Sequence, residues 1–152
     1  MRHRSSIALL SVALLVAACA SPGAPGMTSV FDLETGQCFN QPDDNVVDEV
    51  QVVDCADAHD YEIYAVADYP ADSGTEYVGD EEMGTFVQTT CVEGFETFIG
   101  KTYEESELDV FYLAPTEDSW GSGDREVLCA AYLPGAEGQP EPVEGTLEGS
   151  DR

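Results

Sequence analysis

The sequence predicts an α+β fold, in which one long helix packs on one face of a small antiparallel sheet. Two disulfides are expected to stabilise this domain. Three observations lead to this prediction. Short apolar segments of strand character stand before and after one long segment of helical periodicity. Clusters of Gly, Pro, Asn and Asp separate these segments, as turns do. Four cysteines lie in the same stretch, and this even number allows two disulfides.

Three strand segments are expected in the first half of the domain. Residues 30–33 predict a short strand, and the valine-rich residues 46–53 predict a second. Residues 61–69 alternate between two faces and predict a third strand, which Pro70 ends. The turn-forming residues between these segments favour antiparallel neighbours.

Residues 80–99 are the strongest helix candidate. Their apolar side chains recur every three or four positions, which is the spacing of one helix face: Met83, Val87, Cys91, Phe95 and Phe98. Asp80 is expected to cap the first turn, and Gly100 to end the helix in the left-handed conformation.

Two further strands are expected after the helix. Residues 107–114 predict the first, and residues 127–133 predict the second after a glycine-rich loop that holds the only tryptophan. Residues 134–152 are rich in Pro, Gly and Glu with few apolar residues, so they predict a disordered acidic tail. The folded domain is therefore expected to cover residues 29–133.

The disulfide pairing can be argued from the expected elements, although four cysteines allow three pairings. Cys91 lies on the helix face that should meet the sheet, and Cys129 lies on the last expected strand. A bond between these two would fasten the helix to the sheet. Cys38 and Cys55 would then close the first loop region.

The first 18 residues have the pattern of a lipoprotein signal peptide. A basic start precedes an apolar run that is too short to span a bilayer comfortably, and small residues precede Cys19 as in a bacterial lipobox. An ordinary signal peptide, cut nearby at an alanine-rich site, is the alternative. The lipoprotein hypothesis also explains residues 19–28 as a flexible tether. It places the protein on the outer face of the cytoplasmic membrane, held by lipid on Cys19.

The charge excludes some partners. Without residues 1–18, which include Arg2 and Arg4 but no acid, 3 basic residues stand against 31 acidic ones, a net charge of −28. Such a chain repels nucleic acid. No cofactor or metal site is expected, because the chain has no Cys-x-x-Cys, no calcium-loop motif and only His3 and His59 as histidines. A passive acidic spacer or cation-binding domain remains an alternative function.

His59 and Glu62 form the first candidate site. A histidine beside acids is typical of a general base, which makes a cell-wall hydrolase with His59 and Asp57, Asp60 or Glu62 an alternative function. On an extended segment, however, residues three apart point to opposite faces. The structural interpretation, in which His59 supports the loop around Cys55, is favoured.

Trp120 and Arg125 form the second candidate site. An arginine beside a tryptophan face is typical of carboxylate or phosphate recognition. The structural interpretation is an ion pair between Arg125 and Asp118 or Asp124, with Trp120 covering the core. Ser119 has no histidine close in sequence, so a serine hydrolase is not indicated.

Together the two candidate sites resemble a known family. The resemblance rests on three motifs in order: Gly36-x-Cys38-Phe39, then Cys55-x-x-x-His59-Asp60-x-Glu62, then Pro115-Thr116-Glu117-x-Ser119-Trp120-x-x-Gly123-Asp124-Arg125. This order resembles the septum formation domain of actinobacterial envelope proteins over about residues 33–133. The resemblance implies an extracytoplasmic module with a role around cell division, and it brings no catalytic residues with it.

The expected function is therefore a lipid-anchored, non-catalytic interaction module in septum or cell-envelope assembly. Its expected partners are the membrane, through the lipid on Cys19, and another envelope or division protein. The expected recognition residues are His59, Glu62, Trp120 and Arg125.

Overall fold

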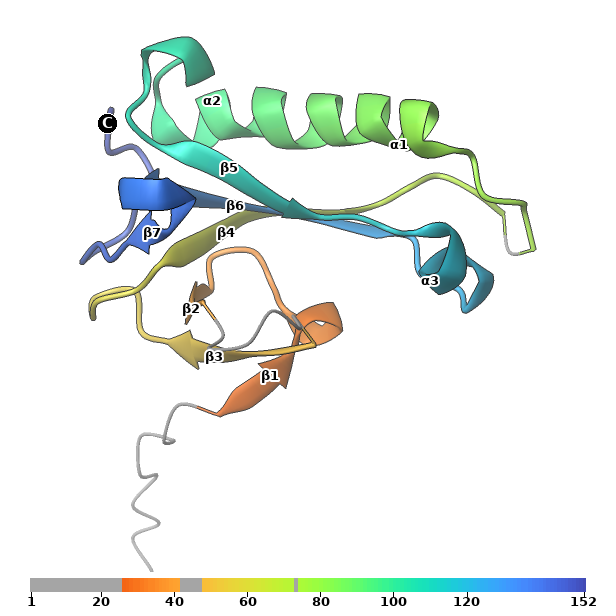
Figure 1. The fold of residues 1–152 in the computed structure, drawn as a ribbon. Coiled ribbons are helices and arrows are strands. Elements are labelled where there is room, and N and C mark those ends of the chain that lie inside the picture. The colour runs from red at the N-terminus through yellow and green to blue at the C-terminus, as the bar shows by residue number, and fades with distance from the viewer. Residues whose placement is uncertain (1–25, 42–47, 73) are drawn as a thin grey trace, which may run out of the picture.

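A computed structural model describes residues 26–41, 48–72 and 74–152. They form a single antiparallel sheet of seven strands, with the long helix lying across one face (Figure 1). The predicted α+β class, the long helix and the two disulfides are confirmed. The expected signal peptide and most of the expected tether lie outside the described residues.

Six strands follow one another across the sheet in the order β1-β3-β2-β4-β6-β5, and β7 pairs with β6. Their bounds are β1 Met27–Ser29, β2 Cys38–Asn40, β3 Glu49–Val53, β4 Tyr61–Asp68, β5 Asp109–Leu113, β6 Glu126–Pro134 and β7 Pro140–Glu141. The central pair is β4 with β6, and Glu62 lies opposite Ala131 while Asp68 lies opposite Glu126. The two ends of this pair position the two candidate sites.

The strand expected at residues 30–33 is wrong. Val30–Asp32 forms a 3-10 turn, and the edge strand β1 precedes it. The Ser29 hydroxyl accepts a hydrogen bond from the Phe31 N–H and starts this turn. The tertiary structure here draws Val30 and Leu33 into the core, where both are buried.

The long helix runs from Asp80 to Ile99 as α1 (Asp80–Val87), a π-helical segment (Gln88–Val92) and α2 (Glu93–Ile99). The Tyr64 hydroxyl donates a 2.7 Å hydrogen bond to the carbonyl of Cys91 within the π-helical segment. Gly79, with φ of 88°, occupies the N-cap position without a side-chain bond, so Asp80 is the first helical residue instead of the predicted cap. Gly100 ends the helix in the left-handed conformation, as predicted.

The core lies on both faces of the sheet, because the residues of β6 alternate between them. Val127, Cys129 and Ala131 pack beneath the helix. Leu128 and Ala130 pack on the other face, against Val30, Leu33 and the aromatic pair of Phe39 and Tyr61. The Cys91–Cys129 disulfide joins helix to sheet, and Cys38–Cys55 closes the first loop region, so both predicted pairings are confirmed.

The prediction of a disordered tail at residues 134–152 is wrong. A short 3-10 turn (Ala136–Gly138) and β7 are followed by a bridge between Val143 and His59. Val143 and Leu147 are buried in the cluster beneath the helix. Composition predicts disorder here because the segment is mostly polar, yet its two apolar side chains, Val143 and Leu147, reach the core and anchor it. Nowhere in 26–41, 48–72 or 74–152 does a helix have the length and apolar character needed to cross a membrane.

Candidate functional site

An open cavity of about 990 Å³ lies beside Trp120. It lies where the loop before α1 meets the short helix α3 (Glu117–Gly121), at the far end of the sheet from β7 (Figure 1). Tyr77, Trp120 and Arg125 contribute to its wall, and Glu76, Asp80 and Glu117 bring carboxylates to it. We call this hollow the Trp120 cavity.

The sequence motif Pro-Thr-Glu-x-Ser-Trp builds the wall through a capping box. The Thr116 hydroxyl accepts a 3.2 Å hydrogen bond from the Ser119 N–H, and the Ser119 hydroxyl accepts a 2.9 Å bond from the Thr116 N–H. Glu117 and Asp118 fall in the first turn, where the helix dipole favours acids. The capping box thus fixes the single turn that presents Trp120.

Trp120 is buried, with 3% of its surface exposed. Its indole Nε1 donates a 2.7 Å hydrogen bond to the carbonyl of Thr75, and its ring meets Tyr69 and Tyr77 edge to face at 5.6 Å. The tryptophan therefore holds the loop before α1 against α3. Trp120 therefore forms the floor of the cavity, and its ring is not a free recognition face.

Arg125 does not form the ion pair predicted with Asp118 or Asp124. Its Nη1 donates to the carbonyls of Trp120 at 2.9 Å and Asp124 at 2.6 Å, and its Cζ lies 3.6 Å from the centroid of a Trp120 ring. Among the described residues, the single ion pair within 4 Å is Arg152 with Glu107. The tight turn after α3, with Gly123 at φ of 101°, places these carbonyls beside the guanidinium. The Asp124 carboxylate accepts from the Glu126 N–H instead.

The carboxylates of the cavity lie at its exposed margin. Glu76, Asp80 and Glu117 are exposed, and Asp80 accepts a 3.0 Å hydrogen bond from the Tyr77 hydroxyl. Partial burial and this hydrogen bond raise the pKa of Tyr77, so its phenol stays neutral. Sequence reasoning missed Tyr77 and Glu76, because the cavity forms only when their loop folds onto α3.

His59 lies in a different place and is fully buried. Its backbone N–H and carbonyl pair with those of Val143 at 2.9 Å, and its Nδ1 lies 3.0 Å from the Asp57 carbonyl. Its Nε2 is buried without a hydrogen-bond partner among the described residues. This supports the structural interpretation of His59.

Glu62 is also buried, with 3% of its surface exposed. Its two carboxylate oxygens accept hydrogen bonds of 2.6 Å from the Thr146 hydroxyl and the Leu147 N–H. His59 and Glu62 thus both bind the C-terminal segment. His59 precedes β4 and Glu62 lies near the start of that strand, whereas Arg125 lies beside its other end. At the rise of an extended chain, the two ends of the strand are about 20 Å apart.

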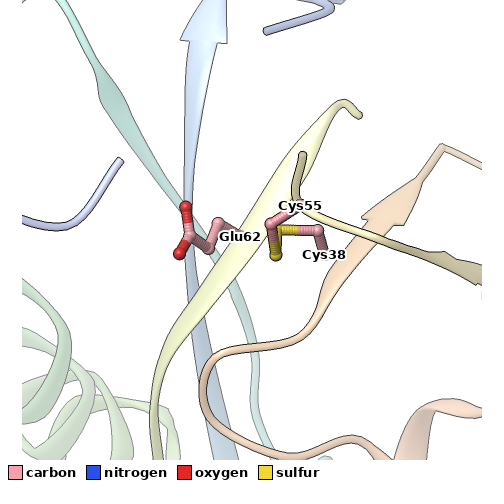
Figure 2. Close-up of side chains that lie close together, drawn as sticks. All are labelled: Cys38, Cys55 and Glu62. Carbon is pink, nitrogen blue, oxygen red and sulfur yellow. A yellow bond between two sulfur atoms is a disulfide. The ribbon is translucent and has the colours of Figure 1, made fainter. Parts of the chain in front are cut away.

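Glu62 also lies near the disulfide of Cys38 and Cys55. One oxygen of its carboxylate and the two sulfur atoms all lie within 4.8 Å of one another. Figure 2 shows that the Glu62 carboxylate points away from the two sulfur atoms. Both sulfurs are bonded to each other at 2.02 Å, so neither is a thiolate in this state. Two of the three groups are thus bonded to each other, and the Glu62 carboxylate binds Thr146 and Leu147.

Comparison with known proteins gives a family match. The model of a family described as septum formation matches residues 35–152, which includes the C-terminal segment. Two curated relatives are proteins of Mycobacterium tuberculosis, from strains CDC 1551 / Oshkosh and ATCC 25618 / H37Rv, and each is described as an uncharacterized membrane protein. Each is 24% identical over 140 residues, which cover 87% of this chain and 31% of the relative. No solved structure matches the chain.

Proposed function

Because the chain belongs to the septum formation family, we propose that it is a non-catalytic interaction module of the cell envelope, acting in septum or envelope assembly. The two relatives are named as membrane proteins, which supports a place at a membrane. Two disulfides support an exported, extracytoplasmic domain. The lipobox pattern before Cys19, outside the described residues, supports a lipid anchor on the outer face of the cytoplasmic membrane.

The observation that carries the proposal is the Trp120 cavity. It is a concave surface of about 990 Å³ with aromatic walls and polar margins, which is the usual form of a binding site. The family-like motif of residues 115–125 builds it through the capping box, the Thr75 bond and the Arg125 stack. A motif that constructs a cavity at the surface is better explained by binding than by stability alone.

The burial of His59 favours an interaction module over the alternative hydrolase. A general base must reach a substrate proton, directly or through one water. The His59 side chain is enclosed by the fold and its backbone is paired with Val143, while Glu62 is committed to Thr146 and Leu147. Neither residue lines the Trp120 cavity.

The proposal is tested by localisation of the full, tagged chain in dividing actinobacterial cells. The variant designed to fill the cavity is Gly121→Phe, because Gly121 lines the cavity, a Cβ built on it meets no atom within 4 Å, and its φ is not in the left-handed region. Gly84 in α1 is exposed and shares both properties, but it does not line the cavity, so Gly84→Phe is the matched control.

We expect enrichment of the parent chain and of Gly84→Phe at new septa, and a uniform peripheral signal for Gly121→Phe at equal abundance. A uniform signal for all three chains would overturn the role in septation. Septal enrichment of Gly121→Phe equal to that of the parent would overturn the role of the cavity.

The lipid anchor is tested separately by fractionation. We expect Cys19→Ser to move the chain from the membrane fraction to the soluble extracytoplasmic fraction, because the thiol that carries the lipid is lost. A Cys19→Ser chain that stays in the membrane fraction would show that the attachment is made elsewhere.

A further inference from the structure

We propose that the Trp120 cavity is one end of a groove that binds a cationic polypeptide segment, with lysine or arginine side chains laid against its aromatic walls. This inference rests on the proposed function, because it names the chemistry of the partner at the same site. It follows from the shape of the groove, the distribution of charge around it and the spacing of its carboxylates.

The groove extends beyond the cavity. A second hollow of about 790 Å³ lies along the start of α1, and Gly79 and Asp80 line both hollows. Tyr69 and Phe86 form its aromatic side, with ring centroids 5.0 Å apart in an edge-to-face arrangement. The two adjoining hollows therefore suit an extended chain better than a compact small molecule.

The charge of the groove is strongly negative. Five carboxylates line it: Glu76, Asp80, Glu81, Glu82 and Glu117. The single cation among the lining residues is Arg125, and its guanidinium is already held by two carbonyls and by the face of Trp120. The field of a chain with 31 acids against 5 bases adds to this local excess. An anionic partner would be repelled, whereas a cationic one would be attracted and oriented.

The aromatic walls match the side chains that such a partner carries. Lysine and arginine lay their aliphatic stems on apolar surface while their charged ends reach polar groups. The partly exposed rings of Tyr77, Tyr69 and Phe86 line the groove beside exposed carboxylates, above the buried Trp120. Arg125 over Trp120 already makes the same kind of contact within the chain.

The spacing of the carboxylates argues for a polypeptide in place of a metal ion. A divalent cation needs several oxygens that converge on one point. Across the part of the chain that the structure describes, no three of the groove carboxylates bring their oxygens within 4.8 Å of one another. Positive charges that are spaced along an extended segment can meet such separated carboxylates one by one.

The test uses the full lipidated chain in neutral detergent and a lysine octapeptide that lacks aromatic residues. Trp120 is the only tryptophan and lines the cavity, so its fluorescence reports occupation of the groove. We expect Gly121→Phe to weaken the fluorescence-detected binding at least about tenfold, equal to about 1.4 kcal/mol, and Gly84→Phe to leave it unchanged.

Charge is tested with pairs of equal net charge. Glu76→Gln/Glu117→Gln removes two carboxylates from the groove, and Glu96→Gln/Glu148→Gln removes two exposed ones that line neither hollow. We expect the first pair to weaken octalysine binding several-fold more than the second, and added salt to weaken binding in every chain. Equal effects of the two pairs would mean that octalysine binds the acidic surface at large, and would overturn the inference.

A glutamate octapeptide supplies the opposite charge. If it changes the Trp120 fluorescence at lower concentration than octalysine does, the groove selects anions and the inference is wrong. The cellular experiment keeps the two proposals apart. Loss of septal enrichment in Gly121→Phe, without octalysine binding to the parent chain, would remove the cationic class while leaving the interaction module. Octalysine binding at the groove, with no change of localisation in Gly121→Phe, would keep the cationic class and would remove the role of the cavity in localisation.

Discussion

The buried carboxylate of Glu62 accepts a 2.6 Å hydrogen bond from the backbone N–H of Leu147, which lies 85 residues later in the chain. Its second oxygen accepts a bond of the same length from the Thr146 hydroxyl. Leu147 is placed by this contact in the core beneath the helix, with 2% of its surface exposed. One acid on the central strand β4 therefore contributes two hydrogen bonds to the attachment of the C-terminal segment.

Replacement of Glu62 should destabilise the domain. We expect Glu62→Ala to lower the free energy of unfolding by about 2–3 kcal/mol, because it leaves the buried Leu147 N–H without its acceptor. Glu62→Gln should cost less, since its amide oxygen can still accept from Leu147 and its amide nitrogen can donate to Thr146. Urea unfolding followed by circular dichroism measures both. Glu148→Ala, at an exposed position, should stay within about 0.5 kcal/mol of the parent.

Removal of the C-terminal segment should have a larger effect. A chain that ends at Glu141 loses Val143 and Leu147 from the core and leaves the His59 backbone without its bridge. Burial of each such side chain contributes about 1.5–3 kcal/mol. We expect a clear fall in the urea midpoint and rapid amide exchange at His59. An unchanged midpoint would mean that the segment adds nothing to the stability of the domain.

The helix and the disulfides could be predicted from the sequence, because their signals are local or of fixed geometry. The apolar side chains from Met83 to Phe98 repeat at helical spacing, and Cys91 stands in the same stripe. A cysteine on that stripe must face the sheet, where Cys129 lies on β6. Two independent patterns thus converged on one contact.

The C-terminal segment and the Trp120 cavity could not be predicted, because both depend on contacts between distant residues. Val143 and Leu147 are two apolar residues in a polar stretch, and their hydrogen-bond partners His59 and Glu62 lie far away in the sequence. Likewise, Asp118 and Asp124 lie near Arg125 in the sequence, which favours an ion pair with one of them. The turn at Gly123 instead brings backbone carbonyls to the guanidinium.

The two disulfides should contribute unequally to stability. Cys91 and Cys129 are 38 residues apart, whereas Cys38 and Cys55 are 17 apart. Loop-closure entropy alone gives about 4 kcal/mol for the longer loop and about 3 kcal/mol for the shorter one. We expect the Cys91→Ala/Cys129→Ala chain to unfold at lower urea than the Cys38→Ala/Cys55→Ala chain. The reverse order would show that the entropy of the unfolded chain does not decide the difference.

Alkaline pH should unfold the domain through its buried tyrosines. Burial, with the charges of Tyr132 and Asp60, raises the pKa of Tyr61 to about 12, and burial raises the pKa of Tyr64 as well. Each phenol contributes stability that is complete below pH 10, the value for an unperturbed tyrosine, and is lost as pH rises through the raised pKa. We therefore expect unfolding to begin above about pH 10, measured by phenolate absorbance and circular dichroism. Tyr61→Phe, which keeps the ring, should move the midpoint to higher pH.

Glu126 should be a site where loss of charge stabilises the protein. It lies opposite Asp68 in the pairing of β4 with β6, and like charges directly opposite each other destabilise a sheet. Burial raises the pKa of Glu126, and the charges of Asp68, Asp124 and Asp32 raise it further. The raised pKa means that the folded state favours the protonated form, so this contribution is present in acid and is lost as pH rises through the folded pKa. At neutral pH we expect Glu126→Gln to unfold at higher urea than the parent, and the difference to shrink as the pH is lowered.

Glu96→Gln, at an exposed position on α2, removes the same charge and should change the midpoint little. If Glu126→Gln were less stable than the parent at every pH, the carboxylate would have to make a favourable contact that outweighs its repulsion by Asp68.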